Sequence, residues 1–156
     1  MKLMWTILAV LVLSLGAFVY SSAQVRADDA VSTARQEATD AARTSVPAML
    51  SYDFSTIDST FPSVADSLAG EFRDEFTELG STVIIPAAHK DSIITSAQVV
   101  ETSVVSSSED EVALLLFLNQ NTTSASQEAP RLDGSRVRVT MSDVDGQWLI
   151  SDLKPV

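Results

Sequence analysis

The chain contains no cysteine, which excludes disulfides, thiol catalysis and cysteine-ligated metal sites. Its single histidine, His89, leaves carboxylates as the main ligands for any metal ion. None of the five glycines forms a G-x-G pattern, and no serine lies in a G-x-S-x-G pattern. The usual sequence signals of phosphate cradles and nucleophilic serines are therefore missing. We predict that the protein is not an enzyme and has no catalytic, cofactor-binding or metal-binding residues.

Positive charge is scarce as well. The chain has 10 Lys and Arg residues against 21 Asp and Glu residues, for a net charge of -11. Only Lys2 precedes Arg26 among the basic residues, so nearly all of this imbalance belongs to the later part of the chain. Nucleic acid and anionic headgroups both need a positive surface, so an acidic domain is a poor match for either. We predict no nucleic-acid partner.

The longest uncharged stretch of the chain runs from Leu3 to Val25. As a helix it would be roughly 34 Å long, enough to cross a bilayer core of about 30 Å. Trp5 and Tyr20 lie near its ends, where amphipathic aromatics favour the membrane interface. A cleaved signal peptide is the alternative, with Ser21–Ala23 or Val25–Ala27 as its cleavage site, but its apolar core would be unusually long. We predict that residues 1–26 form a transmembrane signal-anchor helix in the lipid bilayer.

The charges that flank this stretch predict its orientation. Lys2 and the terminal amine precede it, and Asp28 and Asp29 follow it. Positive charge favours the cytoplasmic side. We therefore predict a single-pass protein of the plasma (inner) membrane, with a cytoplasmic N-terminus and an extracytoplasmic C-terminal domain. A cleaved segment would also leave the domain outside the cytoplasm.

Residues 27–50 have the pattern of a juxtamembrane helix that enters the domain. Small apolar residues recur on one stripe, and charged residues lie on the other side. Pro47 lacks a backbone donor, so we expect it to kink or break this helix near Arg43 to Val46. The remaining residues, 51–156, are the length of one ordinary domain.

The first half of that domain is predicted to be helical. Apolar residues recur at spacings of three or four, interrupted at Gly70, which we expect to divide the pattern into two helices. Gly80 is expected to be a C-cap. The residues of this stripe are Val64, Leu68, Phe72, Phe76 and Leu79.

From Ser92 onward the pattern changes to strands. Glu111 to Asn121 is apolar at odd and even positions, which predicts a central strand buried on both faces. Asp145-Gly146 predicts a tight hairpin between the last two strands. The other strands are expected in Ile93–Val105, where the alternation slips as at a bulge, in Arg136–Ser142 and after Gln147. We predict an α+β fold, with helices on one face of a curved antiparallel sheet of about four strands.

Two groups of residues are candidates for binding. Tyr52 and Asp53 could supply a donor and an acid to an apolar pocket, although phenylalanines at helical spacing are equally typical of a core. The predicted pocket consists of Tyr52, Asp53, Phe72, Phe76 and Phe117, with Phe54 and Phe61 as further lining. The basic residues Arg131, Arg136 and Arg138 form a possible docking face, or the solvated side of a strand.

Several stretches in this order resemble the Mce-associated membrane proteins of mycobacteria and related actinobacteria. The resemblance begins with the single N-terminal apolar span, extends over nearly the whole chain and is densest in its second half. The stretches are LSYDF (residues 50–54), ALLLFLNQNTT (113–123), LDGSRVRVT (132–140) and VDGQWLISDLKPV (144–156).

The resemblance implies an NTF2-like cone over residues 51–156, similar to the periplasmic domain of VirB8 secretion components. It also implies a non-enzymatic accessory subunit that docks on or stabilises an Mce-type lipid or sterol import transporter in the cell envelope. The expected partners are Mce transporter proteins or other membrane-complex subunits. A VirB8-like scaffold of a secretion machine and a pocket for a hydrophobic ligand remain alternatives. The sequence specifies neither the lipid nor the oligomeric state.

Overall fold

The computed structural model describes residues 28–127 and 129–156, in which a set of helices precedes a set of strands. The predicted membrane span from Leu3 to Val25 and the choice between anchor and cleaved signal lie outside these residues. Within the described part of the chain, no helix is both long enough and apolar enough to cross a bilayer.

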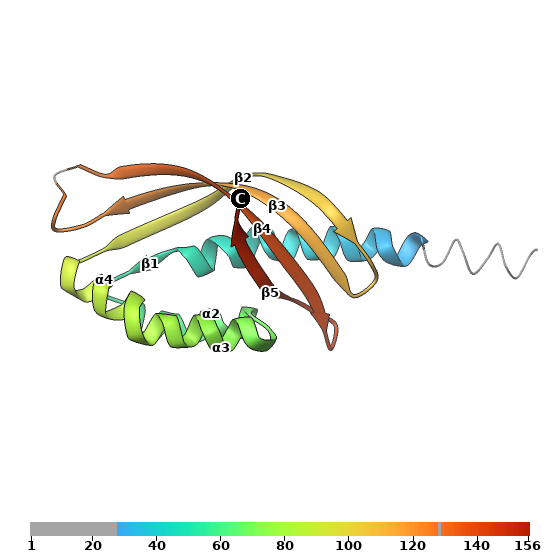
Figure 1. Ribbon diagram of the computed structural model, residues 1–156, viewed down its shortest axis with the longest axis horizontal. Helices are drawn as coiled ribbons and strands as arrows, with labels where there is room; N and C mark the ends of the chain where they lie inside the picture. The colour runs from blue at the N-terminus through green and yellow to red at the C-terminus, as the bar shows by residue number, and fades with distance from the viewer. Residues whose placement is uncertain (1–27, 128) are drawn as a thin grey trace, which may run out of the picture.

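Residues 28–50 form one helix along the sheet (Figure 1). Its buried residues are spaced by three or four positions, so they form one stripe: Ala34, Ala38, Ala42, Val46 and Met49. The helix continues through Pro47, so the predicted break is wrong. Proline removes one backbone hydrogen bond in the last turn, and the burial of Val46 and Met49 on either side holds the helical path.

Short helices form the next part of the chain. After β1 (Tyr52–Asp53) come α2 (Ile57–Val64), the 3-10 turn η1 (Ala65–Ser67), α3 (Gly70–Leu79), the π-helical turn η2 (Gly80–Ile84) and α4 (Ile85–Asp91). Gly70 has a φ of 55° and begins α3, which confirms the predicted division at this glycine. Gly80 is the C-cap of α3, as predicted, but its φ of -59° is not the left-handed conformation typical of a C-cap glycine, and the chain continues through η2 into α4.

The sheet has five strands rather than four, in the order β1-β2-β3-β4-β5, and all neighbours are antiparallel. The long strands are β2 (Ile94–Ser107), β3 (Glu111–Thr123), β4 (Arg131–Val144) and β5 (Gln147–Pro155). The additional strand, β1, has only two residues, too few to show an alternating pattern. Register shifts in β2 confirm the predicted bulge, and Asp145 and Gly146 have φ values of 54° and 81° in the predicted β4–β5 hairpin.

All described helices lie on the same side of the curved sheet, which confirms the α+β architecture (Figure 1). The core lies between the two layers, where Val112, Leu114, Leu116 and Leu118 of β3 are buried. The alternate residues of β3 face the other way, and Phe117 is 38% exposed there. β3 is central, as predicted, but the prediction that both of its faces are buried is wrong.

The helix of residues 28–50 also contacts β2 along much of its length. Arg35 donates to the Ser107 hydroxyl at 3.0 Å, and Arg43 donates to the Thr102 hydroxyl at 3.2 Å. Just beyond the helix, the Ser51 hydroxyl accepts from the Ala97 N–H at 2.8 Å. These contacts run in opposite directions along the two elements, so the helix is antiparallel to β2.

Candidate binding surface on the outer face of the sheet

The aromatic residues predicted to line a pocket pack mainly with one another. The ring centroids of Phe61 and Phe76 are 5.0 Å apart at an interplanar angle of 9°, and those of Phe72 and Phe76 are 6.4 Å apart. Phe72 and Tyr52 pack against the same core cluster. Phe117 does not join them, because it lies on the face of β3 that points away from the helices. The structure therefore separates Phe117 from the rest of the predicted pocket.

Asp53 is held as a carboxylate at a turn. It accepts hydrogen bonds from the Ser55 hydroxyl at 2.6 Å and from the Ser55 N–H at 2.8 Å. These two hydrogen bonds, the hydroxyl first, lower the pKa of Asp53 below its ordinary value. A general acid at neutral pH needs a raised pKa, which this environment does not provide. Asp53 is better explained as a residue that stabilises the turn after β1.

His89 also has a structural explanation. Its Nε2 lies 2.9 Å from Asp58 Oδ2, and both side chains are exposed. This contact joins α4 to α2. In the described residues, no group of three or more His, Asp or Glu side chains is arranged to hold a metal ion.

The most distinctive surface is the side of the sheet that no described helix covers. We call it the outer face and define it by two rows of neighbouring residues. In the first row, Glu101 of β2, Phe117 of β3 and Arg136 of β4 are register partners. In the second row, Ser103, Leu115, Arg138 and Lys154 follow one another from β2 to β5. Each row has an apolar residue on the central strand and a basic residue on β4.

An open groove of about 670 Å³ lies beside Phe117 on this face. Gly134 lines it, and a side chain there would meet only Asn119 Oδ1, at 3.9 Å. Val100 and Val156 add apolar surface and are 57% and 59% exposed. These exposed apolar side chains beside Phe117 make the groove a candidate interaction site.

The predicted basic cluster is divided between two faces. Arg131 is five residues from Arg136 along a strand without a bulge in its pairing to β3, so the two point to opposite faces. Arg131 forms an ion pair with Asp133 at 2.7 Å. In the described part of the chain, no carboxylate lies within 4.0 Å of the guanidinium groups of Arg136 and Arg138. The docking candidate therefore reduces to these two arginines.

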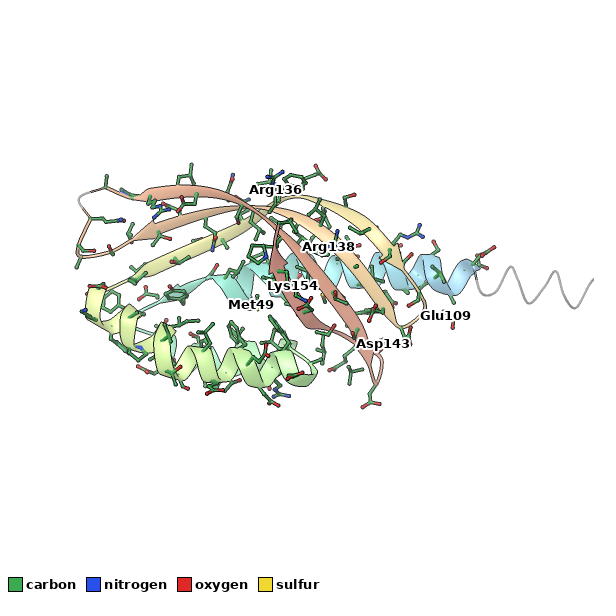
Figure 2. The ribbon with its side chains drawn as sticks, in the orientation of Figure 1. Met49, Glu109, Arg136, Arg138, Asp143 and Lys154 are labelled. Atoms are coloured by element: carbon green, nitrogen blue, oxygen red, sulfur yellow. The ribbon has the colours of Figure 1, made fainter. Side chains whose placement is uncertain are left out.

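Lys154 joins them as a residue that sequence reasoning missed. It is the register partner of Arg138 and forms an ion pair with Asp152 at 2.8 Å. Figure 2 shows Arg136 and Arg138 along β4, with Lys154 on the adjacent strand (Figure 2). Glu101 and Val100 were missed as well, because the bulge between Val99 and Glu101 changes which β2 residues face outward.

Comparisons with known sequences match nearly the whole chain. A family model described as "Uncharacterized protein Rv1363c/MT1408-like" matches residues 3–156. Outer membrane protein Rv1973 of Mycobacterium tuberculosis is 38% identical over 123 residues, which cover 79% of this chain and 76% of that protein.

Two solved structures share the fold at low sequence identity. An IcmL-like type IV secretion system protein from Legionella pneumophila has a TM-score of 0.63 at 10% identity, over 74% of this chain and 87% of that one. Agrobacterium tumefaciens VirB8 has a TM-score of 0.60 at 10% identity, over 76% of this chain and 88% of that one. These likenesses confirm the predicted VirB8-like fold. Neither description names an Mce transporter.

Proposed function

The chain belongs to the Rv1363c/MT1408-like family, and from this premise we propose that it is a non-enzymatic accessory subunit of a membrane complex. Its folded domain binds other subunits of that complex through the outer face of the sheet. The complex that we favour is an Mce-type importer of lipids or sterols, as the resemblance of the sequence implies.

The observation that carries the proposal is the uncovered outer face. Leu115 and Phe117 lie on the central strand of the sheet, where a residue is normally covered by another layer. Arg136 and Arg138 lie beside them and contact no carboxylate in the described residues. Apolar anchors with arginine at their side are the residue types enriched where proteins bind each other.

The name of a relative and the predicted membrane span both support a location in the cell envelope. A relative is named an outer membrane protein, and the segment Leu3–Val25 is predicted to span the plasma membrane once, with the N-terminus in the cytoplasm. The turn that carries Glu109 and the end of β4 at Asp143 lie toward the end at which the described helix begins, and the Asp143 N–H donates to the Asp110 carbonyl at 2.9 Å (Figure 2). Anionic headgroups repel such an acidic end, so the domain stands away from the bilayer.

A scaffold in a secretion machine is the second candidate, favoured by the VirB8-like fold and by the IcmL-like secretion protein that shares it. A pocket for a hydrophobic ligand has less support, because Phe61, Phe72 and Phe76 pack together and Asp53 is held as a carboxylate. Neighbouring genes would separate the first two candidates, since lipid-transport genes favour one and secretion ATPases favour the other.

Co-purification tests the proposal. The tag belongs at the N-terminus, because Val156 lines the groove and its N–H donates to the Arg136 carbonyl at 3.1 Å. In mild detergent, the full chain is expected to retrieve Mce-type transporter proteins. The double variant R136E/R138E should retrieve at least ~10-fold less of them, because it removes both arginines from the proposed docking face.

The matched control is Lys90→Glu, an exposed charge reversal on α4. It should retrieve the same proteins as the original chain. Recovery of the chain without partners would contradict the proposal, and recovery of secretion components would favour the second candidate.

A further inference from the structure

We infer that the outer face of the sheet binds a second copy of this chain, face to face, about a two-fold axis that runs along β3. The inference deepens the proposed function and rests on it, because it names a second copy of the chain as the subunit that binds the outer face. Transporter proteins then bind the paired chains. Closed two-fold dimers are the commonest assemblies of identical chains.

The row of Glu101, Phe117 and Arg136 is self-complementary. It places an acid on β2, an apolar ring on β3 and a base on β4. Neighbouring strands are about 4.8 Å apart, so Glu101 and Arg136 are separated by roughly 10 Å within one copy, with Phe117 between them. Neither residue belongs to an ion pair in the described part of the chain.

A rotation about β3 brings the opposite charges together. It exchanges the two sides of the strand, so β2 of one copy lies over β4 of the other. Glu101 then faces Arg136 twice in the dimer, and Ser103 faces Arg138 in the next row. An axis across the strands would instead place Arg136 over Arg136, which like charges oppose.

The apolar residues lie on the axis itself. Phe117 and Leu115 belong to β3, so each meets its own counterpart in the other copy. Two sheets that pack face to face lie about 10 Å apart, a separation that side chains of this size fill. The contact therefore covers the second face of the strand that the sequence predicted to be buried on both faces.

Membrane anchoring is compatible with this symmetry. The helix of residues 28–50 is antiparallel to β2 and therefore runs in the direction of β3. Rotation about β3 leaves that direction unchanged, so both helices begin at the same end of the dimer. Copies held in one membrane meet at a raised effective concentration, which favours a contact of modest area.

Cross-linking in membranes tests whether the two copies meet. Because the chain has no cysteine, an introduced cysteine is its only thiol. Asn119→Cys places a thiol on the outer face of β3, two residues from Phe117. In membranes that contain the full chain, a short bismaleimide is expected to join most N119C chains into pairs. The control is Glu75→Cys, at an exposed position of α3 on the helical layer, which should not be joined.

Charge reversal gives the decisive result. In the N119C background, Arg136→Glu or Glu101→Arg alone should reduce cross-linking at least ~10-fold, because each creates two like-charged contacts in the dimer. Co-expression of the two single variants with different tags should restore cross-linking between them. The double reversal E101R/R136E in one chain should restore it as well, which shows that the substituted faces still fold.

Two results would overturn the inference: no cross-linking of N119C, or cross-linking that the single reversals do not change. The failures of the two proposals can be told apart. If N119C is cross-linked as expected while the tagged chain retrieves no transporter protein, the dimer is supported and the accessory function is contradicted. If transporter proteins are retrieved while N119C is not cross-linked, the accessory function is supported and the dimer is contradicted.

Discussion

At the scale of single residues, Gly80 has the tightest constraint among the described glycines. A Cβ at this position would overlap the ring of Phe61, which stacks on Phe76 in the core. Gly80→Ala should therefore force the ring from its place and lower the free energy of unfolding by about 1–3 kcal/mol, as overpacking does. Urea unfolding of residues 28–156 measures this change.

Gly134→Ala is the matched control. A Cβ there has only Asn119 Oδ1 within 4 Å, at 3.9 Å, and the backbone at Gly134 needs no positive φ. Its free energy of unfolding should stay within about 0.5 kcal/mol of the original. Equal losses in the two variants would show that the contact with Phe61 does not determine the effect.

The sequence alone does not distinguish these two glycines. Glycine commonly ends helices, which predicts a helix end at Gly80, but the ring that leaves no space for a side chain there belongs to Phe61, 19 residues earlier in the chain. A close approach between residues so distant in sequence leaves no local pattern. Gly70 and Gly146 were predicted correctly, because a positive φ is a local property of the backbone.

At the scale of elements, the helix of residues 28–50 depends on small side chains. Ala38 and Ala42 are completely buried against the sheet. Ala38→Leu should lower the free energy of unfolding by about 1–3 kcal/mol, because the added atoms have no space. Ala48→Leu is the control at an exposed position of the same helix, where leucine is nearly as good a helix former as alanine.

The midpoint of urea unfolding compares the two variants. We expect a clear loss for Ala38→Leu and almost no change for Ala48→Leu. Similar midpoints in both variants would mean that the helix can move away from the sheet at little cost.

Helices and strands were predicted best where a pattern in consecutive residues specifies them. The strands β2 to β5 and their hairpin followed from alternation and turn residues. β3 shows the limit of this reasoning. Its apolar residues on both faces indicated two covering layers, but the chain supplies only one in the described residues. A second layer from another molecule has the same sequence signature.

At the scale of the whole molecule, the boundary predicted at residue 51 can be tested by shortening the chain. The core cluster includes Ala34, Ala38, Ala42, Val46 and Met49, which all precede that boundary. Residues 28–156 are therefore expected to unfold in one cooperative transition in urea. Residues 51–156 should lack that transition and expose apolar surface to a fluorescent dye. A cooperative transition of residues 51–156 would show that the domain begins at the predicted boundary.

The candidate surface was less predictable than the fold for a physical reason. Arg136, Arg138 and Phe117 were each singled out, but in different groups. Their relation depends on the register between β2, β3 and β4, which is set by long-range pairing and by the bulge after Val99. No local pattern shows that an acid, a ring and a base form one row.

The way in which the helix of residues 28–50 packs on the sheet has a mechanical consequence. Tension on the chain before residue 28 would act along the helix axis. Its contacts are spread along its length. Near its start, Arg35 contacts Ser107 and Glu37 contacts Trp148, and near its end Met49 is buried in the core. Such a load shears many contacts at once instead of peeling them in sequence. The element that enters the domain first is therefore also placed to bear force without releasing the sheet.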